Sequence, residues 1–253
     1  MDLTNLPTPV FTSLDGVTQA IAAMVYLAVG FGAWLRAPAD IRTRVFLAFS
    51  IANLIVFGVP TVWWLRGASN PSQLPAAATA AVMAGLGAGA LVLFHFTQVF
   101  PRKRPWIKTS GIQMPIAYCL APPAIAGLIF FAPPAAGGLN VPYILALIVF
   151  GFPLLILLGM VVPVAAIVSL VRSHRDVREQ GLVHLKRSIE WILVSQIAGG
   201  TLTIVFAPVL TVIARNDMAR SALTLAIWAL GLLTPVAFAA AVWKDNVLAV
   251  NAD

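Results

Sequence analysis

A histidine and a glutamine lie inside an apolar run from Leu91 to Trp106, which reads LVLFHFTQVFPRKRPW. His95 is the one histidine within a predicted membrane span, and Gln98 follows it by three residues. Polar side chains in a span usually face the interior of the helix bundle. His95 could therefore sense protons, contact a ligand or act as a single axial ligand to a pigment or haem. A hydrogen bond to a neighbouring helix explains the same residue without a ligand.

After Asp40 in the first loop, Glu190 is the acidic residue that lies in a predicted span. It follows Lys186 by four residues and Arg187 by three, so a helical ion pair at the membrane edge accounts for it. The alternative is that Glu190 meets His95 inside the bundle. Such a pair would form a pH-sensitive conformational switch.

Scattered hydrogen-bonding side chains occupy the outer halves of the predicted spans, among aromatic residues and prolines. They could line a pocket for a small, mostly apolar ligand, and hydrogen bonds between helices are the alternative reading. The candidates for this pocket are Asn53, Gln113, Tyr118 and Gln196.

Sequence motifs of catalysis are absent. The chain has no Walker loop, H-E-x-x-H, G-x-S-x-G or pair of cysteines, and we expect no enzyme activity. A lone histidine without a second ligand at metal spacing is a poor metal site. We therefore expect no catalytic residues and no metal, and the sequence identifies no cofactor.

Composition places these residues in a membrane. The chain has 253 residues, of which 60% are hydrophobic and 10% charged, whereas soluble domains are about 25% charged. A membrane-spanning helix needs roughly 20 apolar residues, and the sequence offers seven. The fold class predicted is therefore an all-α membrane protein, one domain of seven transmembrane helices, at about 17–35, 45–65, 76–100, 112–131, 142–171, 188–214 and 221–242.

Basic residues predict the orientation. If the N-terminus lies outside, 13 of the 16 Lys and Arg residues fall in inner loops and three in outer loops. Such an asymmetry predicts an N-out, C-in topology. The basic residues then serve as topology signals rather than as a nucleic-acid surface, so we expect no nucleic-acid partner. Two inner clusters could contact a cytoplasmic partner or lipid headgroups: Arg102, Lys103, Arg104 and Lys108, then Arg172, Arg175, Arg178, Lys186 and Arg187.

Two stretches carry a resemblance to a known family. LFHFTQVFPRKRPW, at 93–106, resembles the motif that ends the third helix in the seven-helix N-terminal sensor regions of bacterial histidine kinases and related membrane signalling proteins. VRSHRDVREQGLVHLKRSIEWIL, at 171–193, is similar to the charged connection before helix six of that family. The resemblance implies a stimulus site coupled to a cytoplasmic output domain. The chain departs from this pattern after the seventh span, where it reads AVWKDNVLAVNAD with no output domain, so kinase activity is not implied.

These observations predict a non-catalytic, receptor-like sensor that is multi-pass in a bacterial inner membrane. It would bind a small or lipid-like ligand and signal to a membrane or cytoplasmic protein partner. The alternative is a structural or accessory subunit of a larger membrane complex that contacts a pigment or lipid. A transporter component is a third, less favoured reading.

Overall fold

The computed structural model describes residues 13–67, 74–101, 157, 161–181, 183–201, 217–245 and 247–249. Within these ranges the chain is entirely helical, which confirms the all-α prediction. The helices are α1 (Ser13–Arg36), α2 (Ile41–Leu65), α3 (Ala76–Val99), α8 (Val162–Glu179), α9 (Val183–Thr201), α11 (Asp217–Trp243) and the short 3-10 helix η6 (Val247–Ala249).

Three of these helices, α1, α2 and α3, are long and apolar enough to cross a membrane. The chain is therefore a membrane protein by the length and composition of these elements. Their ends agree with the first three predicted spans to within one residue, but α1 begins at Ser13 rather than 17 and α2 at Ile41 rather than 45. The earlier start of α2 follows from Asp40, which caps the helix.

The later spans agree in part. The predicted span at 112–131 lies outside the described residues, and so do most of 142–171 and the end of 188–214. The helix α8 continues to Glu179, well past the predicted end at 171, and α9 begins at Val183, before the predicted start at 188. Much of the charged connection is thus a helical hairpin, formed by the parts of α8 and α9 that extend beyond the predicted spans. Seven spans and their orientation remain predictions.

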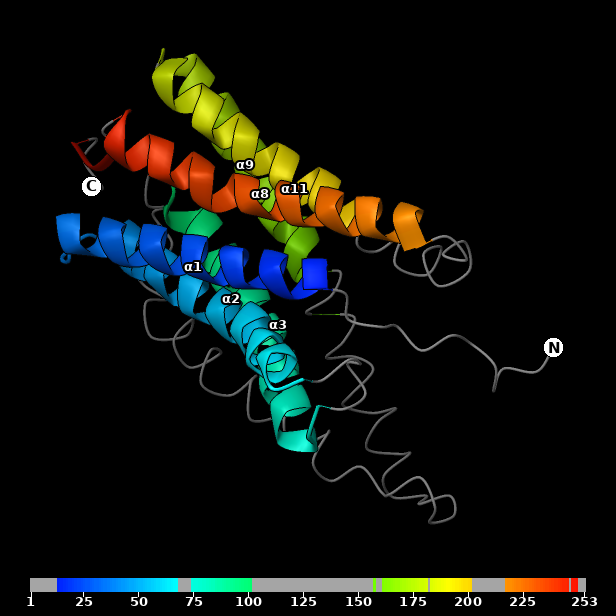
Figure 1. The fold of residues 1–253 in the computed structure, drawn as a ribbon. Helices are drawn as coiled ribbons and strands as arrows, with labels where there is room; N and C mark the ends of the chain where they lie inside the picture. Colours follow the sequence, from blue (N-terminus) through cyan, green and yellow to red (C-terminus); the bar gives the residue numbers. More distant parts are fainter. Residues whose placement is uncertain are drawn as a thin grey trace, which may run out of the picture.

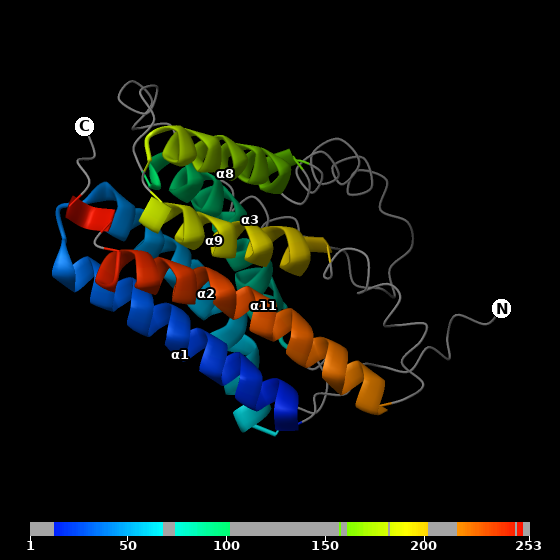
Figure 2. The ribbon, with the colours of Figure 1, turned by 90° about the horizontal axis from the view of Figure 1, so that it is seen from above.

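The six described α-helices make a closed ring of contacts. Consecutive helices pack against each other from α1 to α2, α3, α8, α9 and α11, and α11 packs back on α1. The turns from α1 to α2 and from α8 to α9 and the end of α11 lie at one end of the bundle, at the left of Figure 2. Figure 1 shows α1 beside both α2 and α11. The ring brings chain segments 200 residues apart into contact at that end.

Small residues let these helices approach closely. A Cβ atom on Gly85 of α3 would lie 3.2 Å from the carbonyl oxygen of Ala52 in α2. A Cβ atom on Gly30 of α1 would lie 2.6 Å from the Cβ of Ser50, also in α2. Association of helices in a membrane depends on such close packing, since lipid is as apolar as the side chains.

Candidate functional site

Arg42 is a fully buried cation at the end of the bundle where the chain turns gather. It is the second residue of α2, and 1% of its side chain is exposed. Asp40 holds it locally, because its Oδ1 accepts the backbone N–H of Arg42 at 2.8 Å and caps the helix. The same carboxylate accepts from Arg42 Nε at 3.0 Å and from Nη2 at 2.6 Å. One aspartate therefore both starts the helix and neutralises the arginine.

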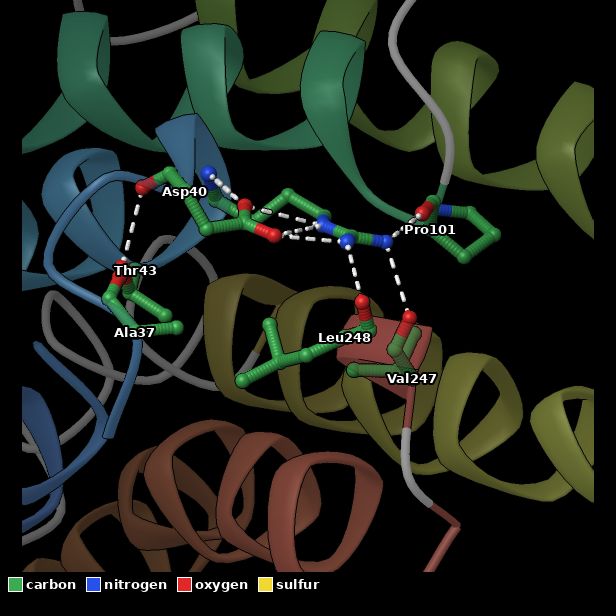
Figure 3. A network of polar contacts seen from close by, with 7 residues as sticks. Ala37, Asp40, Thr43, Pro101, Val247 and Leu248 are labelled. Carbon is green, nitrogen blue, oxygen red and sulfur yellow. Dashed lines mark hydrogen bonds and ion pairs between the residues drawn. The ribbon is translucent and has the colours of Figure 1, made fainter. Parts of the chain in front are cut away.

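The remaining donors of Arg42 reach two distant parts of the chain (Figure 3). Nη1 donates to the carbonyl of Pro101, which follows α3, at 2.9 Å and to that of Val247 at 2.9 Å. Nη2 donates to the carbonyl of Leu248 at 3.3 Å. All five N–H donors of the guanidinium are then engaged. Arg42 is thus a junction of three chain segments, with no donor left to bind an anion.

A cluster of phenylalanines lies on the same helices next to this junction. Phe46, one turn after Arg42, stacks on Phe238 of α11 with ring centroids 3.9 Å apart. Phe96 of α3 packs edge-on against Phe238 at 5.2 Å and stacks on Phe100 at 5.1 Å. The four rings are fully buried and join α2, α3 and α11. Together with the polar contacts of Arg42, they make this end of the bundle one packed unit.

Electrostatics keep the junction charged. Burial alone would raise the pKa of Asp40, but the hydrogen bonds from Arg42 and its positive charge together lower that pKa below the ordinary value of 3.8. Asp40 lies in the turn between α1 and α2. At neutral pH both partners are therefore ionised, which is the arrangement that a buried arginine requires.

The predicted pair at the end of α3 is buried. His95 and Gln98 are each 6% exposed. The amide of Gln98 donates to Thr97 Oγ1 at 3.2 Å, and the carbonyl of Thr97 accepts from Ser169 Oγ of α8 at 3.1 Å. The end of α3 is thereby attached to α8. The contact between the two helices is made by the backbone of Thr97, and Gln98 bonds within its own helix.

Glu190 does not pair with His95, and that expectation was wrong. Its carboxylate lies on the exposed side of α9, 3.1 Å from Nε2 of His174 on α8 and 3.5 Å from Nζ of Lys186. The ion pair expected with Lys186 is present. An exposed glutamate keeps its hydration, whereas moving it toward the buried His95 would cost desolvation. His174, which it contacts, was not among the residues predicted from the sequence.

The two described candidates for an outer pocket bond to different elements. Asn53 donates to the carbonyl of Phe49 in its own helix at 2.8 Å, whereas Gln196 donates to Thr234 Oγ1 of α11 at 2.9 Å. The other two candidates, Gln113 and Tyr118, lie outside the described residues.

Gln196 instead belongs to a polar cluster between helices. Ser195 Oγ lies 2.6 Å from Thr234 Oγ1 and donates to the carbonyl of Leu230 at 2.8 Å. Nearby, Tyr26 of α1 donates its hydroxyl to the carbonyl of Gly231 at 2.9 Å. This interhelical cluster joins α1, α9 and α11.

The structure describes one of the two predicted basic clusters. Arg172, Arg175, Arg178 and Arg187 are exposed, and Lys186 is half-exposed. The other cluster, Arg102, Lys103, Arg104 and Lys108, lies outside the described residues.

Sequence reasoning missed Arg42, Tyr26 and His174. The pattern Asp-x-Arg at a helix start was the signal for Arg42, since an N-cap aspartate reaches the second helical residue. Pro235 was the signal for Tyr26, because a proline frees the carbonyl four residues earlier.

Among the described residues, no group of three His, Cys, Asp or Glu side chains could hold a metal ion. Comparison with models of known protein families and with curated proteins finds no match to this chain.

Proposed function

We propose that this chain is a receptor-like membrane protein, without catalytic activity, that senses a small or lipid-like ligand and passes a helix movement to a protein partner. It would lie in a bacterial inner membrane as seven spans, with the basic end of the bundle in the cytoplasm. The exposed apolar side chains of the helices suit contact with lipid.

The observation that carries the proposal is the junction at Arg42. One guanidinium binds the start of α2, the chain after α3 and the segment after α11. A displacement of any of these segments changes the contacts of the other two, because a buried cation that loses its partners strongly destabilises the fold. The segment at 247–249 is therefore the part of the described chain best placed to report a rearrangement of the bundle.

The test is purification of the native protein in a mild detergent, with mass spectrometry of all co-eluting proteins and small molecules and an absorption spectrum. A receptor should elute alone or with a signalling protein, and Arg42→Ala should weaken that association. Arg44→Ala is the matched control, since Arg44 is two residues away and its Nε donates to the exposed carbonyl of Pro38.

A fixed stoichiometric set of membrane proteins, or a bound pigment, would contradict the sensor proposal. It would favour the accessory-subunit alternative. His95 would then be the first residue to replace, as the candidate ligand of such a pigment.

A further inference from the structure

The hairpin of α8 and α9 carries an exposed face that changes from apolar to basic along its length. On α8, Val164, Val168 and Val171 are exposed, and the arginines that follow on the same side of the helix are exposed too. On α9, the exposed positions run in the opposite direction, from Arg187 to Trp191, Val194 and Ile197. We call Arg172, Arg175, Arg178 and Arg187 the hairpin basic face.

Two hydrogen bonds show how far this face extends beyond the end of α3. Ser169 of α8 is level with Thr97, which lies two residues before the end of α3. At 1.5 Å per residue, Arg175 and Arg178 extend about 9 Å and about 14 Å beyond that level. His174 meets Glu190 across the hairpin, so Trp191 lies near the level where α3 ends. Tryptophan at this depth is typical of a membrane interface.

The turn between α8 and α9 has a defined backbone conformation. Gln180 caps the end of α8, and its N–H donates to the carbonyl of Asp176 at 3.1 Å. Gly181 then adopts a left-handed conformation, with φ of 70°, in which a Cβ would be strained. The turn sends α9 back along α8, and because Glu190 meets His174, Arg187 lies at about the height of Arg175 to Arg178 along the hairpin.

The arginines of the hairpin basic face are not neutralised by acidic side chains within the described part of the protein. Arg172, Arg175, Arg178 and Arg187 make no ion pair with any described residue, in contrast to Arg42. Residues 172–191 hold five Lys or Arg and three Asp or Glu. Of these acids, Glu190 is shared by His174 and Lys186, Asp176 is half-buried and Glu179 is exposed. The exposed side therefore has an excess of positive charge.

We propose that the hairpin basic face binds the headgroups of anionic phospholipids in the leaflet beside it. The face continues directly from the apolar stripes and from Trp191, so its arginines lie at the depth of the phosphates. Each Lys or Arg close to an anionic surface strengthens binding about fivefold. A protein partner is the less favoured occupant, because it would have to cover the lipid-facing stripes as well. This inference does not depend on the proposed sensor function.

The experiment uses the full chain in phosphatidylcholine vesicles that contain a minority of phosphatidylglycerol. Bromine on the acyl chains of one lipid or the other quenches nearby tryptophan. Because the chain has seven tryptophans, the emission of Trp191 is taken as the difference between the protein and Trp191→Phe. Brominated phosphatidylglycerol should quench Trp191 more than its mole fraction predicts, and high salt should weaken this excess.

The triple variant Arg175→Gln, Arg178→Gln, Arg187→Gln should lose the excess, by about fivefold in lipid preference for each charge removed. Its quenching by brominated phosphatidylcholine should persist and rise as this lipid replaces phosphatidylglycerol, which shows that Trp191 still faces the acyl chains. Arg36→Gln is the control, since Arg36 is an exposed arginine at the end of α1 and should keep the preference.

Four results would overturn the proposal. Equal quenching by the two lipids, or an excess retained by the triple variant, would mean that the arginines do not select the headgroup. Loss of the preference on addition of inorganic phosphate would assign the site to free anions. No quenching by either lipid would mean that protein covers the face.

Discussion

Tyr26 donates its hydroxyl to the carbonyl oxygen of Gly231, 2.9 Å away on α11. Pro235 lies four residues after Gly231 within the same helix, and it has no N–H to give to that carbonyl. A tyrosine on a helix far away in sequence therefore supplies the donor that the proline removes. In the interior of a membrane protein such a carbonyl needs a partner, because water is not there to provide one.

Replacing Tyr26 with Phe should destabilise the protein by about 0.6 to 1.7 kcal/mol, the range measured for hydrogen bonds between helices in membranes. The ring contacts with Phe49 and Phe57 would remain, so only the hydrogen bond is removed. Unfolding of the purified protein in detergent, followed by circular dichroism, measures the change.

A double-mutant cycle with Pro235→Ala tests the cause. Alanine restores the N–H at 235, and the carbonyl of Gly231 regains its own helical donor. Tyr26→Phe should then cost less in the Pro235→Ala background than in the natural protein. An equal cost in both backgrounds would mean that the proline is not the reason for this contact.

Removal of the Arg42 side chain should destabilise the bundle by about 3 to 5 kcal/mol, because it leaves Asp40 and three carbonyls without their buried partner. Amide hydrogen exchange should rise at 247–249, whose carbonyls lose their donor. Arg42→Lys should give an intermediate result, since an ammonium has three donors in place of five.

Arg44→Ala is the control for this change and should alter stability by no more than about 0.5 kcal/mol. It removes the same side chain from an exposed position of the same helix. If the two variants lose the same stability, or if exchange at 247–249 is unchanged in Arg42→Ala, the junction does not hold the segment after α11.

The fold was predictable where length and apolarity decide it. The bounds of α1 and α3 follow from uninterrupted apolar runs, since a span has a fixed minimum length. The end of α8 was not predictable in this way, because Arg172 to Glu179 are polar except for Val177, which packs with Ser173 on the buried side of the helix. Polar sequence beside a membrane does not distinguish a loop from a projecting helix.

The candidate site was less predictable. His95 and Gln98 were selected because they are polar residues in an apolar run, and they are indeed buried. Arg42 was counted only as one of the charges that set topology, and its place two residues after Asp40 indicates the cap but not the burial of the side chain. Its distant partners are the backbone carbonyls at 101, 247 and 248. Because every residue type has a backbone carbonyl, such contacts cannot be recognised from the sequence.

Acid should weaken the junction. The pKa of Asp40 is lower in the folded protein than its ordinary value of 3.8, so its ionised form stabilises the fold. This contribution is fully present above the ordinary pKa and is lost as the pH falls through the lower, folded-state pKa. The unfolding midpoint should drop over that acidic range, and Asp40→Asn, which cannot ionise, should lack this component. The same acid response in both proteins would exclude Asp40 as its source.

The approach of α1 to α2 depends on Gly30. A Cβ there would meet the side chain of Ser50, with 2.6 Å between the two Cβ atoms, and Ser50 is fully buried. Gly30→Ala should therefore cost about 1 to 3 kcal/mol through overpacking, measured as a lower unfolding midpoint in detergent.

Gly58 is the matched control on α2. The nearest atom to a Cβ at this position is Cδ1 of Leu54 at 3.6 Å, so alanine fits and should stabilise the helix by about 0.5 to 1 kcal/mol. Adding Ser50→Gly to Gly30→Ala should recover part of the loss, since it removes the atoms that clash. If Gly30→Ala is as well tolerated as Gly58→Ala, α1 and α2 do not pack as closely at this point as the contact requires.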